Sequence, residues 1–257
     1  HRVDRRQRQM CIRDSTYFAF SVIKEGNASQ LNFDYFTLFA ANGLLSFLSI
    51  ILIYLYEKVF GLVSDVTLLE LSNTNTKLLR ELNEKAPGTF QHSMQVANLA
   101  EAAANEIGAN SMLVRTGALY HDIGKMYNPL YFVENQTTGV NPHSDLSPRD
   151  SAKIILDHVI KGIELAKKYN LPDRVIDFIR THHGTTTTYY FYKKEQELNP
   201  DSKIDMKQFQ YQGPIPFSKE TAILMMCDSS EAASKSIKNP TAQSISCLLY
   251  TSPSPRD

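Results

Sequence analysis

Hydrophobic residues recur three and four positions apart along most of this chain, which is the spacing of amphipathic helices. Helices are predicted over residues 89–107, 110–124, 148–169, 172–183, 189–198 and 219–236. Thr89, Asn110 and Ser218 stand where N-terminal caps belong. Ser147 and Pro148 supply a cap and a first-turn proline for another helix. No segment alternates as a strand would, so the pattern predicts an all-α fold.

One apolar segment has a different character from these helices. Residues 36–56 form an uncharged run of 21, FTLFAANGLLSFLSIILIYLY, which is long enough to cross a bilayer. Tyr54 and Tyr56 stand where an interfacial belt would lie. We therefore expect residues 16–60 to be the end of a membrane region, with 17–23 as the tail of a preceding span. Residues 61–88 would be a linker, helical from 66 to 85, that either packs on the next domain or transmits a signal to it.

Ionisable residues lie on helix faces that should be buried, where each is costly unless a partner satisfies it. His92, for example, shares a face with Val96 and Leu99. A single such histidine is usually a hydrogen-bonded core residue, but five helices repeat the pattern. The set is His92, His121, Asp122, His158, His182, His183 and Asp228. Imidazoles and carboxylates without a thiol are typical ligands of a catalytic divalent metal centre.

The order of these residues resembles that of the HD-domain metal-dependent phosphohydrolases. They carry an early histidine, a His-Asp pair such as the one in HDIGK (121–125), and a distant aspartate. The flanking runs APGTFQHS (86–93), ENQ (134–136), NPH (141–143), HHGTT (182–186) and the stretch 213–233 extend the likeness. Together they resemble the bacterial seven-transmembrane HD phosphodiesterases that hydrolyse cyclic di-AMP, over about residues 35–241.

This resemblance implies an HD-domain helical bundle over residues 89–246, preceded by a transmembrane helix, and a site for two divalent metal ions. One metal would be held by His92, His121 and Asp228, the other by His158, His182 and His183, with Asp122 bridging both. Manganese or iron is what the family implies, and the metals would activate the attacking water. Lys125 would act on a substrate phosphate, and His143 would either contact the substrate or order its loop.

The expected function is hydrolysis of cyclic di-AMP to the linear dinucleotide pApA, at the bacterial cytoplasmic membrane with the catalytic domain in the cytoplasm. A homo-oligomer through the membrane region would be compatible with this. A cyclic di-GMP phosphodiesterase of the HD-GYP type is disfavoured, because Gly184-Thr185-Thr186 follows the histidine pair and Gly-Tyr-Pro does not occur. A one-metal mononucleotidase and a catalytically inactive nucleotide receptor are two competing hypotheses for the same residues.

Both ends of the chain look foreign to the gene. Residues 5–15 and 247–257 can be encoded by a transposase-based sequencing adapter and its reverse complement, so we expect 1–15 and 247–257 to be non-native and the HD domain to be truncated. Without 5–15 and 247–257, 22 basic and 25 acidic residues remain, a formal charge of −3, which makes a poor nucleic-acid surface. Cys227 is then the one cysteine left, which fits a reducing compartment.

Overall fold

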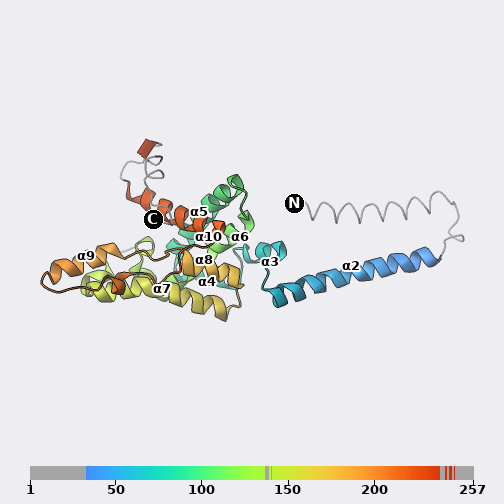
Figure 1. Cartoon of the computed structure of the whole chain (residues 1–257), viewed down its shortest axis with the longest axis horizontal. Helices are drawn as coiled ribbons and strands as arrows, with labels where there is room; N and C mark the ends of the chain where they lie inside the picture. Colours follow the sequence, from blue (N-terminus) through green and yellow to red (C-terminus); the bar gives the residue numbers. More distant parts are fainter. Residues whose placement is uncertain are drawn as a thin grey trace. The chain divides into compact units, whose positions relative to one another are not determined.

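The computed structural model describes residues 33–136, 139, 141–237, 241, 243–244 and 246. The chain divides into two compact units, residues 1–59 and 60–257. The expected span at 17–23 and the ends at 1–15 and 247–257 lie outside the described residues, and their assignment stays a prediction. Figure 1 traces the helices in chain order.

In the first unit the described residues form a helix, α2 (Phe33–Phe60), which contains the predicted 36–56 span. Its segment Ala41–Phe60 has a mean hydropathy of 1.7. Large apolar side chains such as Leu44, Phe47 and Ile51 are exposed along it. Among the described residues this is the one helix long and apolar enough to cross a membrane, by length and composition.

The segment predicted as a linker contains two helices, α3 (Asp65–Leu71) and α4 (Lys77–Lys85), so the prediction of one helix from 66 to 85 is wrong. The interruption has a local cause, because the Asn73 side chain accepts a hydrogen bond from the Asn75 N–H and forms a turn of its own. The sequence predicts Leu68, Leu69, Leu71, Leu78, Leu79 and Leu82 as the apolar face of this segment, but Leu69 is exposed. The leucines of this segment that are buried in the second unit are Leu68, Leu78, Leu79 and Leu82.

The second unit is built from helices that follow the predicted pattern closely. They are α5 (Pro87–Glu106), α6 (Ser111–Tyr120), α7 (Pro148–Lys168), α8 (Asp173–Thr181), α9 (Tyr189–Leu198) and α10 (Lys219–Ser236). Short 3-10 helices connect them: η2 (Ile123–Tyr127), η3 (Pro129–Tyr131), η4 (Val133–Asn135), η5 (Pro142–Asp145) and η6 (Met206–Phe209). α5 packs on α4, α6 and α10, while α8 packs on α6, α7 and α10. Within the described ranges the only β pairing is the isolated bridge between Thr187 and Gln210.

Three of the four predicted caps are confirmed. The side chains of Asn110, Ser147 and Ser218 each accept a backbone hydrogen bond from the first turn of α6, α7 and α10. Thr89 is not a cap, because α5 already begins at Pro87, whose ring suits the first helical position. Thr89 is instead buried inside the helix, where its N–H donates to Asn135 Oδ1 at 3.1 Å.

The helices approach closely where their facing residues are small. Ala97, Ala100 and Ala104 are buried along α5, whereas Leu99, which was predicted on the buried face of His92, is 45% exposed. At Gly124, directly after the His-Asp pair, an added Cβ would lie 1.8 Å from the His158 carbonyl oxygen of α7. This glycine therefore sets the distance between the His-Asp turn and α7.

Replacing Gly124 with alanine should force that turn away from α7. Relief of the overlap has to move backbone, so we expect a loss of about 1–3 kcal/mol in the free energy of unfolding, measured by chemical denaturation of the full chain. The same change at Gly43 in α2, where an added Cβ meets no atom within 4 Å, is the matched control. An unchanged unfolding free energy in Gly124→Ala would contradict the role of this contact.

Candidate metal centre

The His-Asp pair lies where α6 ends. The helix was expected to continue to about residue 124, but it ends at Tyr120, and His121 takes the C-cap position before η2. Both side chains are inaccessible to solvent, with His121 0% and Asp122 2% exposed. The early end of α6 matters because it lets two adjacent residues turn toward the same interior point, which successive positions of a helix do not do.

All seven residues predicted as ligands converge on this point. Their ligand atoms form two groups in which every atom lies within 4.8 Å of the others. The first group is His92 of α5, His121 and Asp228 of α10; the second is Asp122, His158 of α7, His182 and His183. Six of the seven are buried, and His183 is half-buried. Five separate helices or helix ends thus supply one cluster.

The two oxygens of Asp122 face different histidine pairs. Its Oδ2 lies 3.2 Å from His121 Nε2 and 3.7 Å from His92 Nε2. Its Oδ1 lies 3.4 Å from His158 Nε2 and 3.5 Å from His182 Nε2. A carboxylate in this position can bind a cation on each side, which is the bridging geometry expected for Asp122.

The second carboxylate of the cluster is that of Asp228, in the first group. Its Oδ1 lies 3.0 Å from His92 Nε2 and 3.7 Å from His121 Nε2. In the second group, His158 Nε2 and His182 Nε2 are 3.3 Å apart. Two imidazole nitrogens that meet in this way need a proton or a cation between them, since two lone pairs repel.

Hydrogen bonds on the far side of the rings orient three of the histidines. The Nδ1 atoms of His121, His158 and His182 lie 2.7, 2.5 and 2.8 Å from the carbonyl oxygens of Ala118, Ile155 and Ile179, each three residues earlier. In this arrangement Nδ1 is the donor, so Nε2 carries the lone pair. The lone pairs of all three rings therefore face the centre of the cluster, as metal ligands require.

The protonation states match a metal site. Burial acts to raise the pKa of Asp122, but the charges of His121 and Lys125 hold it well below its usual range. Burial acts in the same direction on Asp228, and the neighbouring His121 and His92 rings keep its pKa well below the ordinary value. For His182 and His183 burial lowers the pKa. The site thus offers ionised carboxylates together with neutral imidazoles at His182 and His183.

These residues fit a divalent cation. Burial acts to lower the pKa of His121, but the Asp122 and Asp228 carboxylates outweigh it and raise that pKa to about 10. The pocket therefore attracts positive charge at this ring. His121 Nε2 and Asp122 Oδ1 are both buried without a hydrogen-bond partner, a costly state that a cation bound at each ligand group would relieve.

Comparison with known proteins identifies the second unit. The family model of the HD domain matches residues 89–233, more than half of the 257 residues. The chain belongs to the HD domain family. This confirms the expected all-α HD bundle, in which the turn at His121 and Asp122 gives the domain its characteristic pair.

The similarity to individual HD proteins is high. The cyclic-di-AMP phosphodiesterase PgpH of Listeria monocytogenes serotype 1/2a (strain 10403S) is 50% identical over 195 residues, and that of Bacillus subtilis (strain 168) is 45% identical over 194. Each alignment covers 76% of this chain and 27% of the relative. The crystal structure of the L. monocytogenes PgpH HD domain in complex with cyclic-di-AMP superposes with a TM-score of 0.66 at 50% identity. It covers 69% of this chain and 82% of that one.

Lys125 of the HD domain is held by two carboxylates. Its Nζ lies 2.7 Å from Asp122 Oδ2 and 2.9 Å from Glu134 Oε1, and it also lies over the Phe132 ring. Burial would lower its pKa, but both carboxylates raise it, so the amine stays charged. The sequence analysis predicted that this cation acts on a substrate phosphate. In the structure the amine of Lys125 contacts the carboxylate of Asp122. Glu134, which was not predicted, belongs to the ENQ run that carried part of the resemblance.

His143 is not a member of either ligand group. Its Nε2 lies 3.0 Å from the Tyr131 carbonyl oxygen, and its ring contacts those of Tyr131 and Phe191. These contacts connect η5 with η3 and α9, which agrees with a structural role, one of the two roles considered for His143. Direct contact with a substrate stays a prediction.

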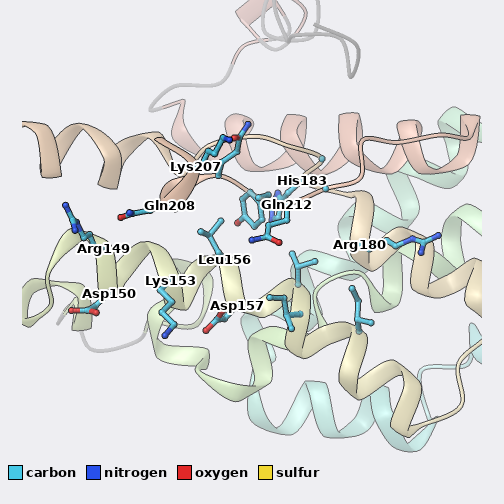
Figure 2. A pocket seen from close by; sticks show the side chains of 17 residues that line it. Arg149, Asp150, Lys153, Leu156, Asp157, Arg180, His183, Lys207, Gln208 and Gln212 are labelled. Atoms are coloured by element: carbon cyan, nitrogen blue, oxygen red, sulfur yellow. The ribbon is translucent and has the colours of Figure 1, made fainter. Parts of the chain in front are cut away.

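A groove opens beside the second ligand group of the HD domain. Its volume is about 580 Å³, and His183 and Tyr211 line it together with cationic residues. The Tyr211 ring is stacked on that of His183, with centroids 4.3 Å apart. Figure 2 shows Arg149 and Lys153 on α7 along one side of this groove. Tyr211 was missed because an aromatic residue in a polar loop carries no pattern that predicts its partner.

Addition of manganese should stabilise this HD domain. A metal that binds the assembled cluster but not the unfolded chain contributes about 2.7 kcal/mol at a free concentration of 100 times its Kd. We expect the thermal unfolding midpoint of the full chain to rise with manganese and to return with a chelator. The variant Asp122→Asn, which weakens the shared ligand, should show a smaller rise. A wild-type midpoint that does not respond to manganese, cobalt or iron would argue against a metal centre.

Proposed function

We propose that this chain is the catalytic HD part of a membrane-anchored, metal-dependent phosphodiesterase that hydrolyses cyclic di-AMP to linear pApA. The observation that carries the proposal is the complete pair of ligand groups joined by Asp122. Support also comes from 50% identity to an HD domain whose crystal structure holds cyclic-di-AMP. The chain covers 27% of the PgpH relatives, so the activity of the whole protein is part of the proposal.

In this proposal each ligand group would hold one divalent metal ion, manganese or iron, and Asp122 would be a ligand shared by both groups. When bound, such a pair of ions supplies a water activated for attack and charge that stabilises a phosphodiester during displacement. The protein positions the ligands: three histidine rings are fixed from behind by backbone carbonyls, and Lys125 holds one oxygen of Asp122. Glu134 in turn holds Lys125.

The groove beside His183 is the proposed position for the part of the substrate that does not react. Its volume of about 580 Å³ lies within the range of small-molecule sites. Lys153 and Lys207 contribute positive charge, which suits the second phosphate of a cyclic dinucleotide. Tyr211 offers a ring against which a base can stack. His143 is kept as a residue that orders the neighbouring loop and can contact substrate.

The membrane assignment is also part of the proposal. α2 would be the last of several spans, with the HD domain following it on the cytoplasmic side of the bacterial membrane and homo-oligomers forming through the spans. Residues 16–60, 61–88 and 89–246 would then be the membrane end, the linker and the HD domain. What supports this is the exposed apolar surface of α2 and the relationship to PgpH.

The full chain should hydrolyse cyclic di-AMP when supplied with manganese. We expect pApA as the product on anion-exchange chromatography and no product after addition of a chelator. Cyclic di-GMP and AMP, tested under the same conditions, separate the competing substrate classes. Turnover of cyclic di-GMP but not of cyclic di-AMP by the metal-loaded protein would overturn the substrate assignment. Binding of cyclic di-AMP without any turnover would favour an inactive receptor.

Replacing Asp122 with alanine should abolish that turnover while leaving the helical content unchanged. The change removes the group that serves both ligand sets, yet it removes no apolar packing. Product formation and circular dichroism measure the two effects. Asp201→Ala, at an exposed loop position, is the matched control and should keep full activity. Retention of wild-type activity in Asp122→Ala would rule out the bridging role.

A further inference from the structure

His92 is oriented differently from the other ring-bonded histidines of the cluster. Where His121, His158 and His182 use backbone carbonyls, the Nδ1 of His92 lies 2.8 Å from Glu231 Oε2. Within the described ranges it is the one cluster histidine whose Nδ1 meets a carboxylate. Glu231 was not among the residues predicted from the sequence.

Glu231 lies in a position that is itself well fixed. It stands on α10 three residues after Asp228, so both carboxylates share one face of that helix. Its side chain is 9% exposed, and its other oxygen, Oε1, lies 2.5 Å from Lys235 Nζ. Both oxygens are thus engaged, one by an imidazole and one by a surface cation. A buried carboxylate is stable only with such partners.

Glu231 is not a member of the ligand set. The two imidazole nitrogens point to opposite edges of the ring, and Glu231 occupies the Nδ1 edge of His92. The Nε2 edge faces Asp228 Oδ1 at 3.0 Å and Asp122 Oδ2 at 3.7 Å. Glu231 therefore acts on the metal position through His92, because that ring stands between its Oε2 and the ligand cluster.

The charge of Glu231 gives this contact a consequence that a backbone carbonyl lacks. A carboxylate behind an imidazole fixes the Nδ1–H tautomer and increases the electron donation of Nε2 to a cation. The second ligand group has backbone carbonyls behind His158 and His182. The first group receives an additional negative charge through His92, so its affinity for a divalent cation should exceed that of the second group.

We propose that Glu231 is a positioning residue for the first metal site: it holds His92 in place and selectively strengthens the affinity of the His92–His121–Asp228 group for a divalent cation. This rests on the proposed two-metal centre. The affinity of each of the two ligand groups for a metal ion can be measured without substrate.

The test is a manganese titration of the full chain, with free Mn²⁺ followed by its electron paramagnetic resonance signal. The wild type should show a tight and a weaker site. Glu231→Ala should weaken the tight site by about 10–100-fold and leave the weaker site unchanged. Glu231→Gln should recover part of the affinity, because its amide oxygen still accepts from Nδ1–H while the charge is gone. Glu101→Ala, which removes a surface carboxylate paired with Arg115 on the helix that carries His92, should match the wild type.

Three outcomes would overturn the proposal for Glu231. One is wild-type affinity at both sites in Glu231→Ala. Another is equal weakening of both sites with loss of thermal stability, which would indicate a general structural role. A third is a Glu231→Gln variant that binds manganese as tightly as the wild type, because the negative charge would then contribute nothing. A wild type that binds no manganese would instead refute the metal centre itself, which keeps the two failures distinct.

Discussion

The sharing of one buried carboxylate by two sets of histidines is the constraint on which this domain depends. Asp122 directs Oδ2 toward His92 and His121 and Oδ1 toward His158 and His182. Each separation is between 3.2 and 3.7 Å, so the helices that carry these rings must keep their relative positions closely. The packing of the helical bundle holds these rings in that arrangement.

Small residues make the arrangement possible. Gly124 allows the His-Asp turn to contact the backbone of α7 next to His158, and Gly117 accommodates the Phe178 ring of α8. The end of α6 at Tyr120 lets the pair turn inward together. Function and folding therefore impose the same requirement here, because a change that separates these elements also separates the ligand groups.

A surrounding set of charged groups makes such a concentration of buried polar atoms tolerable. Lys125 and Glu134 form a chain of ion pairs on one side of Asp122, and Glu231 with Lys235 forms another behind His92. The two chains act on different atoms, Asp122 Oδ2 and His92 Nδ1. They leave Asp122 Oδ1 and His121 Nε2 without a hydrogen bond, at the position where the two proposed metal sites meet.

The sequence by itself determined the helix pattern, most caps and all seven residues of the cluster. Hydrophobic periodicity and the order of histidines and aspartates can both be recognised along the chain without knowledge of any tertiary contact. The sequence could not determine which atom meets which. The roles of Glu134, Tyr211 and Glu231 depend on contacts between segments far apart in the chain, for instance 139 residues between His92 and Glu231. Burial of Thr89 likewise depends on a distant partner, Asn135. The break between α3 and α4 has a local cause, because the Asn73 side chain forms a turn that the helical pattern did not predict. Only packing decides the pairings between distant segments, because they require two surfaces to meet.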